Sequence, residues 1–107
     1  MNKIFINQII ELVSPEKIIL FGSLAKGNVT KESDYDLLVL IKSVLNKRLV
    51  TQQLYKELVP FKIAVYLIVD TPENYEKYKK EKSFIYYQID KTGKIIYDKS
   101  TQCTDLD

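Results

Sequence analysis

KIILFGS (residues 17–23) and DYDLLVLI (residues 34–41) are the two stretches that decide the fold of this chain. Each combines an apolar run, typical of a buried strand, with small or acidic residues at one end. Residues i and i+2 of a strand point to the same face, so Asp34 and Asp36 should project together, with Cα atoms about 6–7 Å apart. If the two strands are neighbours, the Gly22-Ser23 turn and these carboxylates meet at one end of a sheet.

Such a meeting point predicts a site for a metal ion and a phosphate chain. Two adjacent carboxylates repel each other unless a cation lies between them, and hard oxygen ligands favour Mg²⁺ or Mn²⁺ over zinc. Gly22 lets the backbone approach a phosphate, and Ser23 adds a hydroxyl and an N–H group. The alternative is a simple turn followed by acids that solubilise a strand start. Asp36 favours the metal site, because it interrupts an otherwise apolar strand, where an idle carboxylate is costly.

Composition narrows the class of protein. A chain of 107 residues with 46% hydrophobic content predicts one compact domain. The net charge of only +2 does not favour direct nucleic-acid binding. The absence of His and the single Cys103 exclude His-based catalysis, an intrachain disulfide and a zinc cluster of His or Cys ligands. A reduced, cytoplasmic setting is the default expectation. No membrane span is expected, and Met1–Leu12 is interpreted as part of the fold rather than a signal peptide.

Hydrophobic periodicity predicts alternating helices and strands. Residues 1–98 are expected to form the domain and 99–107 a polar, frayed tail. The fold class is α+β, with a small mixed sheet packed against helices. The expected strands are Lys17–Phe21, Tyr35–Ile41, Phe61–Val69 and Lys94–Tyr97. The expected helices are 2–13, Leu45–Val59 ended by Pro60, a helix from a Thr71 cap to about Lys82, and a helical stretch at Phe84–Ile89. A loop is expected at Leu24–Ser33, opening with a helical turn at Ser23, and a turn at Lys91–Gly93.

The two motifs, Leu20–Gly27 and Ser33–Val39, resemble those of the minimal nucleotidyltransferases of the DNA polymerase β-like superfamily. That family's pattern is Gly-Ser, about ten residues, then Asp-x-Asp, frequently preceded by Ser. Ile68–Glu73 resembles its strand-to-helix junction and Gly93–Tyr97 its closing strand. The resemblance covers nearly the whole chain and implies the nucleotidyltransferase fold. Members of this group are often antitoxin-type partners of HEPN-domain proteins in prokaryotic toxin–antitoxin pairs.

The resemblance also implies a site and an activity. Asp34 and Asp36 would hold Mg²⁺ (or Mn²⁺), while Gly22 and Ser23, with Ser33, would bind ATP as the nucleotide substrate. The implied reaction transfers a nucleoside monophosphate to a partner protein of the HEPN type. The assembly could be a homo-oligomer or a hetero-oligomer. Lys26 could add charge to the site or simply lie on a helix surface. Transfer to a small molecule, as in antibiotic-modifying relatives, is a further alternative.

One departure from the family pattern puts the activity in question. Relatives carry a third acid about five residues before the Thr of the strand-to-helix junction, where this chain has Tyr66. The only acid in that strand is Asp70, roughly 13 Å further along the same face, and it is interpreted as a strand-end or helix-start residue. General-base assistance is typically worth roughly 10²–10⁴-fold in rate. The alternative function is therefore a catalytically weakened or inactive binding subunit that regulates a HEPN-type complex.

Tyrosines and lysines are interleaved near the C-terminus, at Tyr75, Tyr78, Tyr86 and Tyr87 among Lys77–Lys82. Such a pattern could contact a protein partner or RNA. It is also typical of a solvated helix whose tyrosines pack over the core while the lysines face water. The second interpretation is preferred for each single residue.

Overall fold

A mixed five-stranded sheet forms the centre of the computed structural model, which describes residues 3–25, 35–101 and 103–104. The strand order is β3-β2-β1-β4-β5. β2 and β3 run parallel, and the other neighbouring pairs are antiparallel. The bounds are β1 Lys17–Phe21, β2 Tyr35–Leu40, β3 Val65–Asp70, β4 Lys94–Asp98 and β5 Cys103–Thr104. The expected α+β class with a mixed sheet is thus confirmed.

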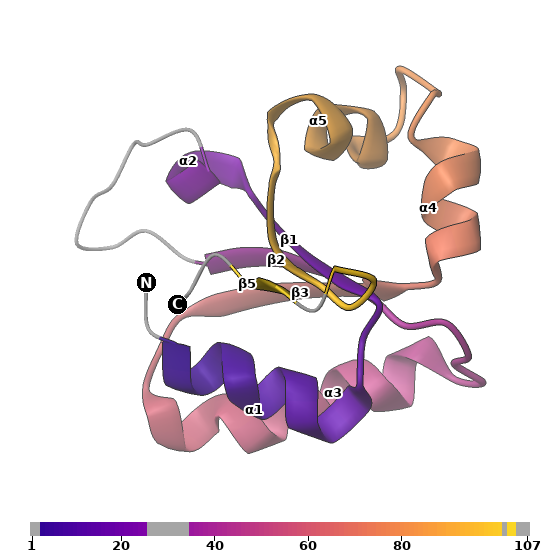
Figure 1. Ribbon diagram of the computed structural model, residues 1–107. Helices are drawn as coiled ribbons and strands as arrows, with labels where there is room; N and C mark the ends of the chain where they lie inside the picture. The colour runs from indigo at the N-terminus through magenta and orange to yellow at the C-terminus, as the bar shows by residue number, and fades with distance from the viewer. Residues whose placement is uncertain (1–2, 26–34, 102, 105–107) are drawn as a thin grey trace.

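Helices cover both faces of this sheet (Figure 1). α1 and α3 pack on one face, and α4 and α5 lie on the opposite face. The helices are α1 Lys3–Val13, α2 Gly22–Ala25, α3 Lys47–Leu58, α4 Pro72–Tyr78 and α5 Ile85–Thr92, with a 3₁₀ turn at Val59–Phe61. None of the helices in these ranges is both long enough and apolar enough to cross a membrane.

The alternation of side chains along the central strand builds two separate cores. Leu37 and Val39 of β2 join the core under α1 and α3, whereas Leu38 and Leu40 join the core under α4 and α5. Because successive side chains of a strand point to opposite faces, a strand covered on both faces has to be apolar throughout. Asp36, on the same face as Leu38, therefore faces the α4/α5 side of the sheet.

Two expected boundaries around α3 are wrong. The helix begins at Lys47 rather than Leu45, because the Asn46 side chain caps it by accepting a hydrogen bond of 3.1 Å from the backbone N–H of Leu49. β3 begins at Val65 rather than Phe61. The 3₁₀ turn that contains Pro60, followed by Lys62 in a left-handed conformation (φ 54°), delays the start of the strand.

Two boundaries further along the chain also differ. The cap at Thr71 is confirmed, since its side chain accepts a hydrogen bond from the N–H of Asn74, but α4 ends at Tyr78 rather than near Lys82. The chain turns there and brings the Phe84 ring against the Tyr78 ring, with centroids 5.0 Å apart. The predicted turn at Lys91–Gly93 is wrong in its first two residues, because α5 continues through Thr92.

The expected loop and tail are described only in part. Leu24 and Ala25 belong to α2, which begins at Gly22, so the predicted helical turn is present and extends through Ala25, and the rest of the expected loop lies outside the described residues. In the expected tail, Cys103 and Thr104 form β5 and pair with Asp98 and Tyr97. The described sheet therefore extends by one short strand beyond β4.

Two leucines of α3 allow a matched test of the core. Leu54 is 0% exposed and Leu49 is 60% exposed. We expect Leu54→Ala to lower the free energy of unfolding by about 2–5 kcal/mol, because it leaves a cavity between α3 and the sheet. Leu49→Ala should change it by less than about 1 kcal/mol. Urea unfolding followed by circular dichroism measures both, and equal losses would contradict the placement of α3.

Candidate active site

The Gly22 turn and the Asp36 carboxylate meet at one end of the β1–β2 pair. Phe21 of β1 lies opposite Asp36 of β2, so the turn that follows Phe21 lies beside the acid. Gly22 has φ +74°, a conformation that side-chain-bearing residues rarely adopt. A Cβ on Gly22 would collide with Oδ2 of Asp36 and would lie 3.1 Å from its Cγ. Only glycine therefore leaves room for this carboxylate against the turn.

The other residues of the predicted site are only partly placed. Ser23 is the second residue of α2, directly after Gly22. Ser33, Asp34 and Lys26 lie outside the described residues. The structure thus brings together one half of each motif, Gly22 and Asp36, at the end of the sheet where the sequence predicted that they meet.

Asp36 and Gly22 fit a hard divalent cation with a phosphate chain. A carboxylate supplies the oxygen ligands that Mg²⁺ prefers. The absence of a Cβ at Gly22 lets the Asp36 carboxylate lie directly against the turn, so a cation held by Asp36 would lie close to the Gly22 backbone. Asp36 is half-buried, so its charge is less screened than that of a fully exposed acid.

Tyr66 occupies the position next to Asp36 on the neighbouring strand. The parallel pairing of β2 and β3 sets Asp36 opposite Tyr66. The Tyr66 side chain is 51% exposed on the α4/α5 face of the sheet. A phenol therefore stands beside Asp36, which fits the departure from the family pattern noted in the sequence. Across the described residues, no three Cys, Asp or Glu side chains come together as a metal-binding group.

Asp70 lies away from this site and ties the helices to the sheet. It pairs with Leu40, four positions further along the strands than the Asp36–Tyr66 pair. Its carboxylate is buried and accepts hydrogen bonds from the Tyr86 hydroxyl (2.5 Å), the Thr71 N–H (2.8 Å), the Asn74 amide (3.0 Å) and the Lys47 ammonium (3.1 Å). The interpretation of Asp70 as a strand-end and helix-start residue is confirmed.

The surroundings of Asp70 keep it ionised. Burial on its own would raise the pKa of this carboxyl, but the four hydrogen bonds outweigh burial and hold the pKa below the ordinary value of 3.8. Burial, followed by the hydrogen bond to Asp70, raises the pKa of the Tyr86 hydroxyl well above its ordinary value of 10.0. The pair therefore carries its negative charge on Asp70 and its proton on Tyr86.

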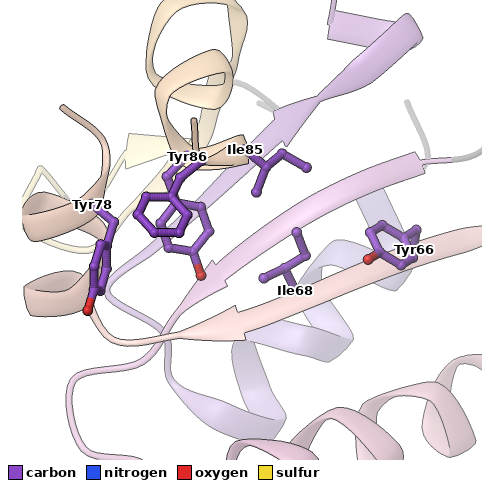
Figure 2. Close-up of a pocket in the computed structure, with 6 residues that line it drawn as sticks. Tyr66, Ile68, Tyr78, Ile85 and Tyr86 are labelled. Carbon is purple, nitrogen blue, oxygen red and sulfur yellow. The ribbon is translucent and has the colours of Figure 1, made fainter. Parts of the chain in front are cut away.

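Two hollows flank the Gly22–Asp36 end of the sheet, and the sequence did not predict either one. The larger, of about 340 Å³, lies under the start of α5, with Tyr66 at one end and Tyr78 at the other (Figure 2). The smaller, of about 150 Å³, adjoins Gly22. Ile85 lines both hollows. The larger is lined by Tyr66, Ile68, Tyr78, Phe84, Ile85 and Tyr86, and the smaller by Phe21, Gly22, Ile85, Gln88, Ile89 and Thr92.

The tyrosine–lysine stretch divides between the core and this hollow. Tyr75 and Tyr86 are buried, with ring centroids 5.5 Å apart, so the expectation that tyrosines pack over the core is confirmed for them. Lys79 lies over the Tyr75 ring at 5.7 Å and pairs with Glu76 at 3.0 Å. The sequence signal that could have indicated a hollow here is the apolar pair Phe84-Ile85. In the structure both side chains, just before and at the start of α5, are about half exposed.

Residues 5–102 match the family model described as "Polymerase beta, Nucleotidyltransferase". The chain therefore belongs to this nucleotidyltransferase family. No curated protein is significantly similar in sequence.

Solved structures share the fold. A toxin-antitoxin crystallised with AMP-PNP is 24% identical, with a TM-score of 0.64 over 92% of this chain and 74% of that one. A mutant of the toxin-antitoxin MntA-HpeT is 22% identical, with a TM-score of 0.62 over 92% of this chain and 74% of that one. A Sulfolobus solfataricus protein described as a nucleotidyltransferase is 18% identical, with a TM-score of 0.61 over 95% and 85%.

The Asp70 contacts predict a pH-dependent contribution to stability. We expect Asp70→Asn to lower the free energy of unfolding by about 2–3 kcal/mol at pH 7, because hydrogen bonds to a charged group are lost at a buried position. Since the folded-state pKa is lowered, this stabilisation is fully present above the ordinary value of 3.8 and is lost as the pH falls through the folded-state value. Urea unfolding across this pH range measures the effect.

Glu81→Gln is the matched control, because Glu81 is an exposed acid between α4 and α5. It should leave the free energy of unfolding within about 0.5 kcal/mol of the unmodified chain. The difference in free energy of unfolding between Asp70→Asn and the unmodified chain should shrink as the pH falls and Asp70 is protonated. A difference that stayed constant with pH would contradict the role of the ionised carboxylate.

Proposed function

We propose that this chain binds a magnesium-complexed nucleoside triphosphate, with ATP as the nucleotide. The observation that carries the proposal is the contact of the Asp36 carboxylate with the side-chain-free Gly22 turn. Asp34 and Asp36 would hold Mg²⁺ (or Mn²⁺), while Gly22, Ser23 and Ser33 would bind the phosphates. Membership of the nucleotidyltransferase family supports this use of the two motifs.

Each part of the site has a chemical role. The bound cation would neutralise the triphosphate and favour displacement at the α-phosphorus. The Gly22 turn, free of a Cβ, keeps the Asp36 carboxylate against the backbone, so a cation held there would bring the phosphates to the turn. Asp36, half-buried at the start of β2, supplies a fixed negative charge that orients the cation.

The proposed activity is transfer of the AMP group of ATP to a hydroxyl of a partner protein: the hydroxyl oxygen bonds to the α-phosphorus and loses its proton, and pyrophosphate leaves. Two solved structures with this fold are described as toxin-antitoxin structures, one of them with AMP-PNP, which supports a nucleotide and a protein partner here. The proposed partner is a HEPN-domain protein, this chain is the antitoxin-like subunit, and the setting is cytoplasmic. The pairing of Tyr66 with Asp36 favours one alternative, a catalytically weakened subunit that binds nucleotide and regulates the partner.

Calorimetric titration of ATP into the purified chain tests the binding site. We expect binding with Mg²⁺ and none with a chelator, because the triphosphate is bound through the cation. Asp36→Asn keeps the shape of the side chain but removes its charge. It should therefore weaken Mg-ATP binding by about 100-fold or more, since even residues that only support a metal ligand are worth about 10–100-fold.

Glu11→Gln removes an exposed acid of α1, on the opposite face of the sheet, and should leave the affinity for Mg-ATP unchanged. Binding that was equally strong with chelator, or that survived Asp36→Asn, would overturn the metal–phosphate assignment. The Asp34→Asn/Asp36→Asn double variant extends the same test to the second acid of the motif.

Tyr66 allows a gain-of-function test of the transfer activity. We expect Tyr66→Asp to raise the rate of transfer of the labelled α-phosphate from Mg-ATP to the co-encoded partner by about 10²-fold or more. The new carboxylate would stand beside Asp36, where it could accept the proton of the attacking hydroxyl. Quantifying label on the separated partner measures the rate.

Tyr66→Asn is the matched control, since it removes the ring without adding a base. It should not raise the rate of transfer. Equal rates for Tyr66→Asp and Tyr66→Asn would show that the missing acid does not limit this chain. Label found on a small molecule instead of the partner would redirect the function to small-molecule modification.

A further inference from the structure

The larger hollow lies next to the candidate nucleotide site. Tyr66, which lines one end of it, lies opposite Asp36 across the β2–β3 pair. Ile85 lines both this hollow and the smaller one beside Gly22. A ligand held at Gly22 and Asp36 by its phosphates therefore has the larger hollow immediately beside it.

The walls of the hollow suit a flat, uncharged group. Its six described lining residues contribute four aromatic rings and two isoleucine side chains, and none of them is charged. Ile68 from β3 and Ile85 from the start of α5 lie between the rings of Tyr66 and Tyr78 (Figure 2). A volume of about 340 Å³ lies at the lower end of the range of small-molecule sites, roughly 300–1,000 Å³. It is large enough for one nucleobase.

One buried hydrogen bond and one ring contact hold part of the wall in place before any ligand arrives. The Tyr86 hydroxyl donates to Asp70 at 2.5 Å, and the Phe84 and Tyr78 rings pack edge to face. Phe84 and Ile85 remain about half exposed, so a bound base would remove apolar surface from water. A site that is already formed loses little conformational entropy on binding.

We propose that this aromatic hollow, lined by Tyr66, Ile68, Tyr78, Phe84, Ile85 and Tyr86, binds the base of the nucleoside triphosphate. The inference rests on the proposed function, since it assumes that the phosphates bind at Gly22 and Asp36. Recognition is by stacking and apolar contact, because four rings and two isoleucine side chains make up the described lining and the Tyr86 hydroxyl is already donated to Asp70. Every base has a flat π face, so ATP and GTP should bind with affinities within about tenfold of each other.

The experiment compares Mg-ATP with inorganic tripolyphosphate and Mg²⁺, which carries the phosphates without a base. Phe84→Ala should lower the affinity for Mg-ATP by about 5- to 100-fold, the range seen for loss of one stacking ring. It should leave the affinity for tripolyphosphate unchanged. Phe84→Tyr keeps the ring and should retain the affinity for Mg-ATP.

An isoleucine pair supplies the matched control. Ile85, at 49% exposed, lines the hollow, whereas Ile95, at 46% exposed, lies on β4 and does not line it. Ile85→Ala should lower the affinity for Mg-ATP by about 3- to 10-fold, and Ile95→Ala should leave it unchanged. Both side chains are half exposed, so both variants should keep the thermal midpoint of unfolding within a few degrees.

The outcomes separate the two proposals. If Asp36→Asn weakens both ligands while Phe84→Ala and Ile85→Ala weaken neither, the phosphate site stands and the base assignment is overturned. If those two variants also lose transfer at unchanged ATP affinity, the hollow binds the acceptor instead, which likewise overturns it. If neither ATP nor tripolyphosphate binds the unmodified chain, the proposed function fails and this inference fails with it.

Discussion

The buried carboxylate of Asp70 joins the separate parts of this protein at one end of β3. It accepts hydrogen bonds from Lys47 of α3, from Thr71 and Asn74 at the start of α4, and from Tyr86 of α5. An ionised group can remain at a buried position only when its hydrogen-bonding capacity is met, and here three helices meet it. The position of α5 over the sheet, and with it the aromatic hollow beside Asp36, depends on this set of bonds.

The site itself follows from a second constraint, the close approach of Asp36 to Gly22. β2 is covered on both faces, so its alternation fixes which side chains face α4 and α5, and Asp36 is one of them. The parallel neighbour β3 then sets Tyr66 beside Asp36. The same strand pairing thus places a phenol next to the candidate metal ligand and begins the apolar hollow. A nucleotide-binding role and a weakened chemical step are both consistent with this arrangement.

Much of the fold could be read from local patterns. β1 matches its predicted range, and α1 and β2 match theirs within one residue at each described end, because apolar periodicity and the Ser14-Pro15 stop are properties of neighbouring residues. The errors fall where local signals compete. The Asn46 cap makes α3 begin later than the apolar stripe predicted. Lys62 adopts a left-handed conformation, which a lysine in the sequence does not predict. α5 continues through Thr92 because its backbone bonds persist past the expected turn.

The sequence alone determined the strand and helix order, the two motifs, and the absence of a carboxylate at position 66, since each depends on residue type and spacing. Tertiary structure decided that Asp70 serves the helices rather than the site, because its partners Lys47 and Tyr86 are distant in sequence and meet it only after folding. The hollow beside Asp36 likewise depends on tertiary structure. Its walls come from β3, α4, the segment before α5 and α5 itself, and only the packing of those elements on one face of the sheet brings them together.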